Sequence, residues 1–354
     1  MVEQFNPESL LHPAVVQSPH ESEDFSLPIT LKPLEAKLLP DESLRLIETK
    51  HSGDPEGKYP ERQHHLVEAV IDGRKHIFWH TAPLEQDDEM VTVFVKPGLG
   101  EVVESGIGWK HHKQMARKMP GAEVISHATH GVGPHGEEIG LGGLWNHGVS
   151  QMAEDEAKLL HKFWQGANLL LVGISMGTVE NHRVAHANID AKDPLNIAGV
   201  VNYAPALVDP KQIIRDLCFR FTPAMARDGI EELLLRTHPL HYIGTIGMLL
   251  ASRPRRRDAL VMARQSLSIL AGTPEEEVRD VASAYPSATV VGDRDPAGQL
   301  LMWQGIEKDI DDFVLRPVRG GHGIAVKPLQ GANKTSKTIR EMGFHVGPAE
   351  LKSV

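Results

Sequence analysis

The chain has 354 residues, of which 41% are hydrophobic, and a formal net charge of −10 at pH 7. This length allows one large domain or two ordinary ones with a substantial core. The acidic balance argues against nucleic acid as a main partner.

The single cysteine, Cys218, excludes an internal disulfide and a zinc site built from several cysteines. It lies in an apolar, helix-like stretch, where we expect a packed thiol. The first residues contain neither a basic segment nor an apolar core, so no signal peptide is expected. Because no apolar run approaches the roughly 18 residues of a membrane span, we expect a soluble, cytoplasmic protein.

Residues 1–60 differ from the rest of the chain, because they hold 8 of its 24 prolines and show weak periodicity. We interpret them as an N-terminal extension that docks on the domain or is partly disordered. Ser43–Glu48 is a candidate short element within it.

A pattern of strands begins near residue 64. His65–Ile71 and Lys75–His80 flank Asp72-Gly73, which is a strong signal for a β-hairpin. Met90–Val95 is continuously apolar, as in a central strand that is covered on both faces.

From residue 108 onward, helical and strand patterns alternate, which is typical of a doubly wound sheet. Residues 209–283 interrupt this alternation with mostly helical patterns and predict a helical insertion. Its basic run Arg253–Arg257 is either a solvated loop or a contact for an acidic group. The other predicted helices are 108–118, 151–164, one after 177, and 297–310, and the predicted strands are 122–126, 168–173, 197–203, 288–291 and 313–318.

Histidines gather in and just before a glycine-rich loop at 127–148. Their spacing matches no metal-binding pattern, so we prefer a compositional bias to a zinc or iron site. They are His111, His112, His127, His130, His135 and His147.

The most informative segment is Gly173–Gly177 (Gly-Ile-Ser-Met-Gly), directly after an apolar strand pattern. A serine on a sharp strand-to-helix turn has strained backbone geometry, and glycines two residues away on each side remove the clashes. Ser175 would then stand at a helix N-terminus, which favours developing negative charge. The alternative is a glycine-flanked turn with an ordinary serine.

A serine nucleophile needs a base, and the base needs an orienting carboxylate. Both residue types follow apolar strands downstream, in Gly292–Asp295 and in Arg319–Gly323. Active sites in parallel sheets lie outside the carboxyl ends of the strands, so we expect these side chains at one edge.

The segment Gly173–Gly177 and the two later segments resemble those of the serine α/β-hydrolase superfamily, in particular its esterase- and lipase-like members. In that family the serine turn is called the nucleophile elbow. The resemblance extends over roughly residues 64–345. It implies Ser175 as nucleophile, His322 as base, and Asp295 as the acid, with Asp293 as the alternative.

The same resemblance implies a doubly wound, mostly parallel α/β-hydrolase sheet with a helical cap. The core would be residues 61–208 and 284–354, and the cap would be 209–283. For the oxyanion hole it implies the amides of Met176 and Leu99. Leu99 lies in Pro97–Gly100 (Pro-Gly-Leu-Gly), where the family often has His-Gly-x-Gly, so the proline is a departure.

The activity that the resemblance implies is carboxylic ester hydrolysis through an acyl-enzyme, without a metal or organic cofactor. Thioesterase, amidase or peptidase, and carbon–carbon bond hydrolase remain alternatives, because fold does not fix function. Apolar residues in 209–283 favour a small-molecule substrate with an apolar acyl or alkyl group, or else form the core of the cap. A non-catalytic ligand receptor is the alternative from another class. The oligomeric state stays open, and residues 1–60 are a candidate for mediating association.

Overall fold

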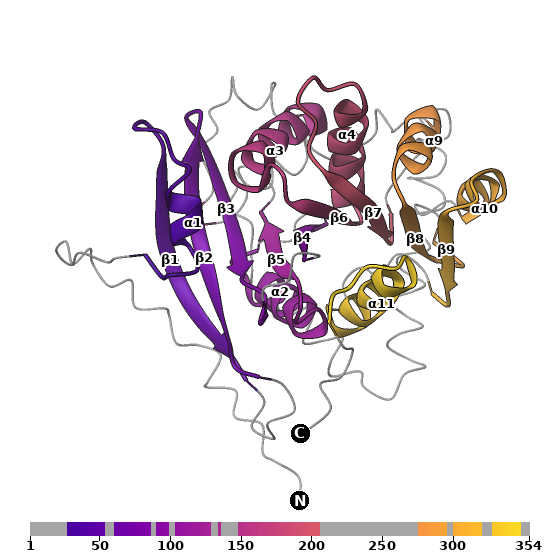
Figure 1. The fold of residues 1–354 in the computed structure, drawn as a ribbon. Helices are drawn as coiled ribbons and strands as arrows, with labels where there is room; N and C mark the ends of the chain where they lie inside the picture. Colours follow the sequence, from indigo (N-terminus) through magenta and orange to yellow (C-terminus); the bar gives the residue numbers. More distant parts are fainter. Residues whose placement is uncertain are drawn as a thin grey trace, which may run out of the picture.

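The computed structural model describes residues 27–53, 60–85, 90–98, 103–128, 134–135, 148–205, 275–295, 300–320 and 328–347. In this part of the chain, nine strands form one sheet (Figure 1). In spatial order the strands are β1 (Ser43–Ser52), β2 (Arg62–Ile71), β3 (Arg74–Thr81), β5 (Glu123–His127), β4 (Val91–Lys96), β6 (Asn168–Ile174), β7 (Ile197–Tyr203), β8 (Ser287–Gly292) and β9 (Phe313–Val318). The helices are α1 (Lys32–Glu35), α2 (Gly106–Lys118), α3 (Val149–Trp164), α4 (Gly177–Ile189), α9 (Glu275–Ala284), α10 (Leu300–Asp309) and α11 (Pro328–Glu341).

The sheet is antiparallel at one end and parallel over the rest. Strands β1, β2, β3 and β5 pair antiparallel, whereas every pair from β5 to β9 is parallel. The predicted doubly wound, mostly parallel sheet is therefore confirmed. Strands β4 and β6 are neighbours, but the chain continues from β4 to β5 on one side and from β6 to β7 on the other. Ligands of open α/β sheets bind at such a switch point, outside the carboxyl ends of the strands.

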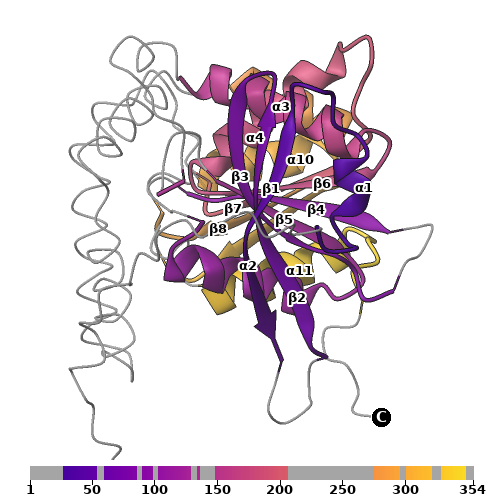
Figure 2. The ribbon, with the colours of Figure 1, turned by 90° about the vertical axis from the view of Figure 1, so that its left-hand side faces the viewer.

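Both faces of the parallel strands are covered, which explains their continuous apolar runs. Alternate residues of β6 point to opposite faces. Leu170 and Val172 join a core with α2 and α11, whereas Leu169 and Leu171 join a core with α3 and α4. The two helical layers are visible on either side of the sheet when it is seen edge-on (Figure 2).

The hairpin predicted at Asp72-Gly73 is confirmed. Both residues have positive φ, 50° and 73°, as the turns that suit a twisted two-residue hairpin require. The structure also shows that β1, within residues 1–60, is a ten-residue edge strand with a bulge between Leu46 and Glu48.

Helix α11 was not predicted from the sequence. Its buried side is mostly small and polar, with Thr335, Ser336 and Thr338 beside Ala332 and Ile339. A helix with so few apolar residues gives a weak periodic signal, so the tertiary contact with α2 and β7 decides its position.

Several predicted features lie outside the described residues. They are the N-terminal part of the extension (1–26), most of the predicted helical insertion (209–274) with Cys218 and Arg253–Arg257, and the loop positions His130 and His147. The end of the predicted insertion is described and forms α9. No helix among the described residues is both long and apolar enough to cross a membrane.

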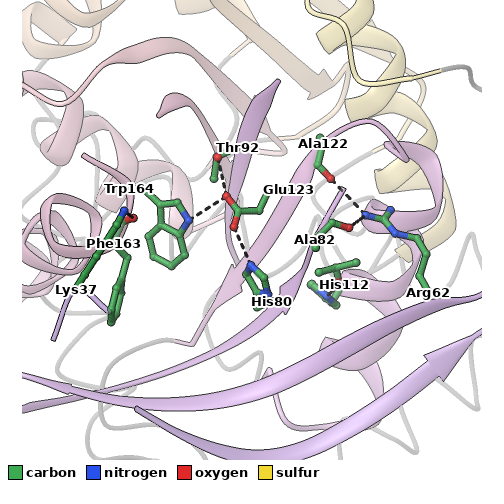
Figure 3. Close-up of polar contacts among 11 residues, drawn as sticks. Lys37, Arg62, His80, Ala82, Thr92, His112, Ala122, Glu123, Phe163 and Trp164 are labelled. Carbon is green, nitrogen blue, oxygen red and sulfur yellow. Dashed lines mark hydrogen bonds and ion pairs between the residues drawn. The ribbon is translucent and has the colours of Figure 1, made fainter. Parts of the chain in front are cut away.

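A half-buried carboxylate ties four elements together at the amino ends of the parallel strands. Glu123 begins β5 and accepts hydrogen bonds from His80 Nε2 at 2.7 Å, Thr92 Oγ1 at 2.8 Å and Trp164 Nε1 at 3.0 Å (Figure 3). Burial alone would raise the pKa of Glu123, but these hydrogen bonds and the charge of His80 lower it overall. The carboxylate is therefore satisfied and joins β3, β4, β5 and α3.

A buried chain of hydroxyls and imidazoles crosses the antiparallel strands and α2. Ser52, His64, Thr81, His112 and Ser126 follow one another at 2.5, 2.6, 2.7 and 2.9 Å. Burial lowers the pKa of His64 to about 3 and that of His112 well below its ordinary value. Both imidazoles are therefore neutral in the folded protein at neutral pH.

Buried neutral histidines predict a loss of stability in mild acid. Burial lowers the pKa of His64 to about 3 and the pKa values of His65 and His182 to about 4. Below about pH 6.5 the unfolded chain binds protons at these sites that the folded chain does not. Each such site lowers the free energy of unfolding by about 1.4 kcal/mol per pH unit, until the pH reaches the folded-state pKa.

His182→Gln tests this dependence. His182 Nε2 lies 3.1 Å from Asn202 Oδ1, so a glutamine amide can replace the donor without titrating. We expect the free energy of unfolding, from urea titrations between pH 8 and 4.5, to fall less steeply below pH 6.5 in the variant. At pH 8 His182 is neutral in the folded and the unfolded protein. The difference in unfolding free energy between variant and wild type at this pH therefore measures only the packing cost of the substitution. Parallel curves for variant and wild type would contradict the prediction.

Candidate active site

The turn between β6 and α4 places Ser175 in a strained conformation. Ser175 has φ +52°, which is rare for a residue other than glycine. Its amide donates to Tyr203 O at 3.0 Å, so the turn is fixed to the end of β7. From Leu169 to His182 every residue is buried except Ser175, which is half-buried. These are the features of a serine presented at the tip of a strand-to-helix turn.

The glycines around Ser175 are required by close backbone contacts. A Cβ on Gly173 would lie 2.4 Å from Thr178 Cα, and a Cβ on Gly177 would lie 2.3 Å from Lys96 O. Neither backbone can give way to a side chain at such distances. Gly98 is also tight, because a Cβ there would lie 3.1 Å from Ser175 Cβ.

Of the two predicted oxyanion donors, the structure describes Met176 only. Met176 is buried and is the N-cap of α4, directly after the serine. Leu99 lies outside the described residues. The described segment before it, Pro97–Gly98, runs beside Ser175 at the end of β4.

The two candidate acids occupy different environments in the loop after β8. Asp293 is partly exposed and its Oδ1 accepts a hydrogen bond from Gly320 N at 2.9 Å. Asp295 is only 5% exposed. The Asp293 carboxylate thus joins the loops after β8 and β9, and the buried carboxylate is that of Asp295.

Backbone hydrogen bonds connect the loops at the carboxyl edge of the sheet. Ser175 N bonds to Tyr203 O, Ala204 N to Val290 O, and Arg294 N to Gly320 O. Ser175 and Asp295 therefore lie on one connected rim. His322 lies two positions beyond Gly320 and outside the described residues.

The described histidines do not form a metal site. Within the described ranges, no group of three or more His, Cys, Asp or Glu side chains is arranged to hold a metal ion. His112 belongs to the hydroxyl–imidazole chain, and His135 N donates to Glu104 Oε1 at 3.2 Å.

A buried ion cluster that the sequence patterns did not predict lies beside the turn that carries Ser175. Lys96 Nζ lies 2.7 Å from Glu156 Oε2 and 2.7 Å from Glu180 Oε2, and all three side chains are fully buried. The available signals were charges inside apolar patterns. Lys96 ends the apolar strand β4, and Glu156 lies four residues from both Met152 and Leu160 on the apolar side of α3.

Charge balance in this cluster involves one ammonium and two carboxylates. Burial alone would lower the pKa of Lys96, but Glu156 and Glu180 raise it above its ordinary value. Burial raises the pKa of Glu180 to about 7, with Lys96 opposing the rise and Glu156 adding to it. The cluster therefore holds one extra proton at mildly acidic pH and loses it as the pH rises through neutrality.

The same cluster fixes the orientation of two imidazoles. His127 Nδ1 lies 3.1 Å from Lys96 Nζ, and His127 Nε2 lies 3.2 Å from His76 Nδ1. Because an ammonium can only donate, His127 Nδ1 accepts and its Nε2–H donates to His76. The cluster thus reaches from α3 and α4 across the sheet to β3.

Gly177→Ala tests the close contact between Gly177 and the carbonyl oxygen of Lys96. We expect this variant to lose about 2 kcal/mol or more of unfolding free energy, because overpacking against a fixed backbone costs about 1–3 kcal/mol. Gly305→Ala in α10 is the matched control, since its nearest atom would be the flexible Arg279 Nη2 at 3.5 Å. Gly305→Ala should leave the unfolding free energy unchanged or raise it, because alanine favours a helix interior more than glycine does. Urea unfolding of both proteins measures the difference, and equal stabilities would contradict the contact.

Comparison with known proteins finds similarity in structure only. No family model matches the chain, and no curated protein matches it. An enol-lactonase from Burkholderia xenovorans LB400 superposes with a TM-score of 0.56 at 15% identity, covering 78% of this chain and 98% of that one.

Two further structures are similar to the same extent. A serine hydrolase involved in carbazole degradation has a TM-score of 0.53 at 13% identity, with 77% of this chain and 98% of that one covered. A bromoperoxidase from Bacillus anthracis has a TM-score of 0.52 at 14% identity, with 78% and 98% covered. Taken with the strand order and the strained serine turn, this likeness shows that the chain has the α/β-hydrolase fold.

Proposed function

We propose that the protein is a serine hydrolase that cleaves a carboxylic ester through an acyl-enzyme on Ser175. The observation that carries this proposal is the backbone of Ser175, held at φ +52° at the switch point of the sheet. Strain at a single non-glycine residue marks a function when the surroundings enforce it. Here Gly173 and Gly177 contact neighbouring backbone without space for a side chain.

In the proposed reaction, His322 takes the proton of the Ser175 hydroxyl as Oγ attacks the ester carbonyl. Asp295 orients the imidazole and stabilises its cation. The amides of Met176 and Leu99 stabilise the tetrahedral oxyanion. His322 then gives its proton to the departing alkoxide. Water, deprotonated by the same imidazole, attacks the acyl-enzyme, and the proton returns to Ser175 as the acid is released.

The choice of Asp295 over Asp293 is supported by burial and by hydrogen bonding. A triad carboxylate acts from a buried position next to the imidazole. Asp295 is buried, whereas Asp293 is half-exposed and bonds the Gly320 amide. By holding Gly320, Asp293 would fix the start of the loop that carries His322.

The substrate class is proposed from the fold and from the sequence of residues 209–283. Neighbours of the same fold include an enol-lactonase and a serine hydrolase, which supports hydrolysis, but also a bromoperoxidase. The fold alone therefore does not select the reaction. We propose a small-molecule ester with an apolar acyl or alkyl group, and residues 209–283 as the cap that would contact this group.

Labelling with a fluorophosphonate probe tests the nucleophile. We expect one adduct by intact mass on the wild type and none on Ser175→Ala or His322→Ala, because phosphonylation needs an activated serine. Short p-nitrophenyl esters should be hydrolysed by the wild type only. Ligand binding without labelling or turnover in folded wild-type protein would instead support a non-catalytic receptor.

A pair of isosteric variants distinguishes the two acids. Asp293→Asn keeps an oxygen for the Gly320 amide, so we expect its labelling rate to stay within a few-fold of the wild type. Asp295→Asn should lower kcat about 10⁴-fold, as expected when the orienting carboxylate of a triad is lost. The reverse ranking of the two variants would assign the acid to Asp293.

A further inference from the structure

We propose that Lys96, held by Glu156 and Glu180, is a positioning residue that fixes the start of the oxyanion loop against the nucleophile turn. This inference rests on the proposed serine chemistry. It assigns a role to a buried cluster that lies beside the turn and takes no part in the steps above.

Lys96 contacts α4 through both its backbone and its side chain. Its carbonyl oxygen packs against Gly177 so closely that no Cβ fits there. Its Nζ bonds Glu180, one turn further along the same helix, at 2.7 Å. One residue at the end of β4 therefore fixes both the position and the rotation of the first turn of α4.

The segment that Lys96 fixes leads directly to the proposed oxyanion donor. Pro97 and Gly98 follow Lys96, and a Cβ on Gly98 would lie 3.1 Å from Ser175 Cβ. Leu99 is the next residue. A displacement of Lys96 would move Pro97 and Gly98 relative to Ser175. Because the proposed donor Leu99 is attached to Gly98 and oxyanion stabilisation depends on donor positions, we expect catalysis to suffer.

The three charged residues of the cluster and the two imidazoles next to it come from five different elements. Lys96 comes from β4, Glu156 from α3 and Glu180 from α4, and the imidazoles are His127 from β5 and His76 from β3. The next imidazole of α4 belongs to His182, whose Nε2 bonds Asn202. Helices α3 and α4 begin at the carboxyl edge where Ser175 lies, and strands β4 and β5 end there.

A role in stability alone is the competing explanation. Replacing a buried ion pair or triad by well-packed hydrophobic residues of similar volume is often neutral or stabilising, so buried charges do not by themselves indicate a role in stability. Charged hydrogen bonds do impose a specific geometry, because each fixes a direction and a distance. A variant that keeps the fold but removes the charges therefore separates the two explanations.

The informative variant is the triple substitution Lys96→Met, Glu156→Gln and Glu180→Gln. It leaves no buried charge unpaired, whereas Lys96→Met alone would leave two carboxylates facing each other. Glu123→Gln is the control, because it makes the same Glu-to-Gln change to a half-buried, hydrogen-bonded carboxylate at the opposite, amino edge of the sheet. The measurements are the second-order rate of fluorophosphonate labelling, kcat and KM for a p-nitrophenyl ester, and the thermal midpoint.

We expect the triple variant to fold and to label about 100-fold more slowly, as for a misplacement of about 1 Å near reacting groups. Its kcat should fall while KM changes less than threefold. Glu123→Gln should lower the thermal midpoint and leave the labelling rate within twofold of the wild type. A folded triple variant that labels as fast as the wild type would overturn the proposal.

Glu180→Gln tests the part that Glu180 plays in holding Lys96. As the pH rises through the pKa of Glu180, about 7, the ionised carboxylate of the wild type pairs more strongly with the Lys96 ammonium, 2.7 Å away. The glutamine variant cannot gain this charge. The ratio of variant to wild-type labelling rates should therefore fall between pH 6 and 8.5, and a pH-independent ratio would count against the proposal.

Hydrogen exchange separates failure of this inference from failure of the proposed function. Absence of labelling in the wild type would overturn the serine chemistry. The amides of Lys96, Gly98 and residues 175–178 should nevertheless exchange faster in the triple variant than in Glu123→Gln. Equal exchange in these two variants would overturn the positioning role whether or not the protein is an enzyme.

Discussion

The contact between the Lys96 carbonyl and Gly177 is the constraint on which the other contacts at the carboxyl edge of the sheet depend. No carbon atom fits between these two backbones. Helix α4 can approach β4 so closely only if the chain turns sharply after β6, and Ser175 takes the left-handed conformation that makes this turn. Such a conformation costs about 1–3 kcal/mol, which the surrounding structure must offset. The hydrogen bond from Ser175 N to Tyr203 O and the buried residues on both sides of the turn hold it in place.

The two edges of the parallel sheet satisfy buried charge in different ways. At the amino edge, Glu123 accepts from an imidazole, a hydroxyl and an indole, so one carboxylate is surrounded by donors from three elements. At the carboxyl edge, the single positive charge of Lys96 lies between two carboxylates, those of Glu156 and Glu180. The first arrangement joins strands. The second one retains a group, Glu180, with a pKa of about 7, close to the backbone that supports Ser175.

Sequence patterns predicted the parts of the fold that depend on local periodicity. The apolar runs of β4, β6 and β7 and the Asp72-Gly73 turn were found because each leaves a signal within a few residues. Helix α11 was missed because its buried side is polar. The cluster of Lys96, Glu156 and Glu180 was missed for another reason, since 84 residues separate its ends and only the strand order brings them together. A charge inside an apolar pattern marks such residues but does not say which of them meet.

The two aspartates after β8 show the same limit at the scale of one loop. Their positions differ by two residues, so spacing alone supports either of them as the acid. The structure separates them by burial, and it gives Asp293 a contact that the sequence does not reveal, the hydrogen bond to Gly320 N. Gly320, with φ +137°, is the last described residue before His322, and this bond joins it to the loop after β8. In the proposed mechanism, Asp295 would orient the imidazole of His322 directly, and Asp293 would act through the backbone that leads to it.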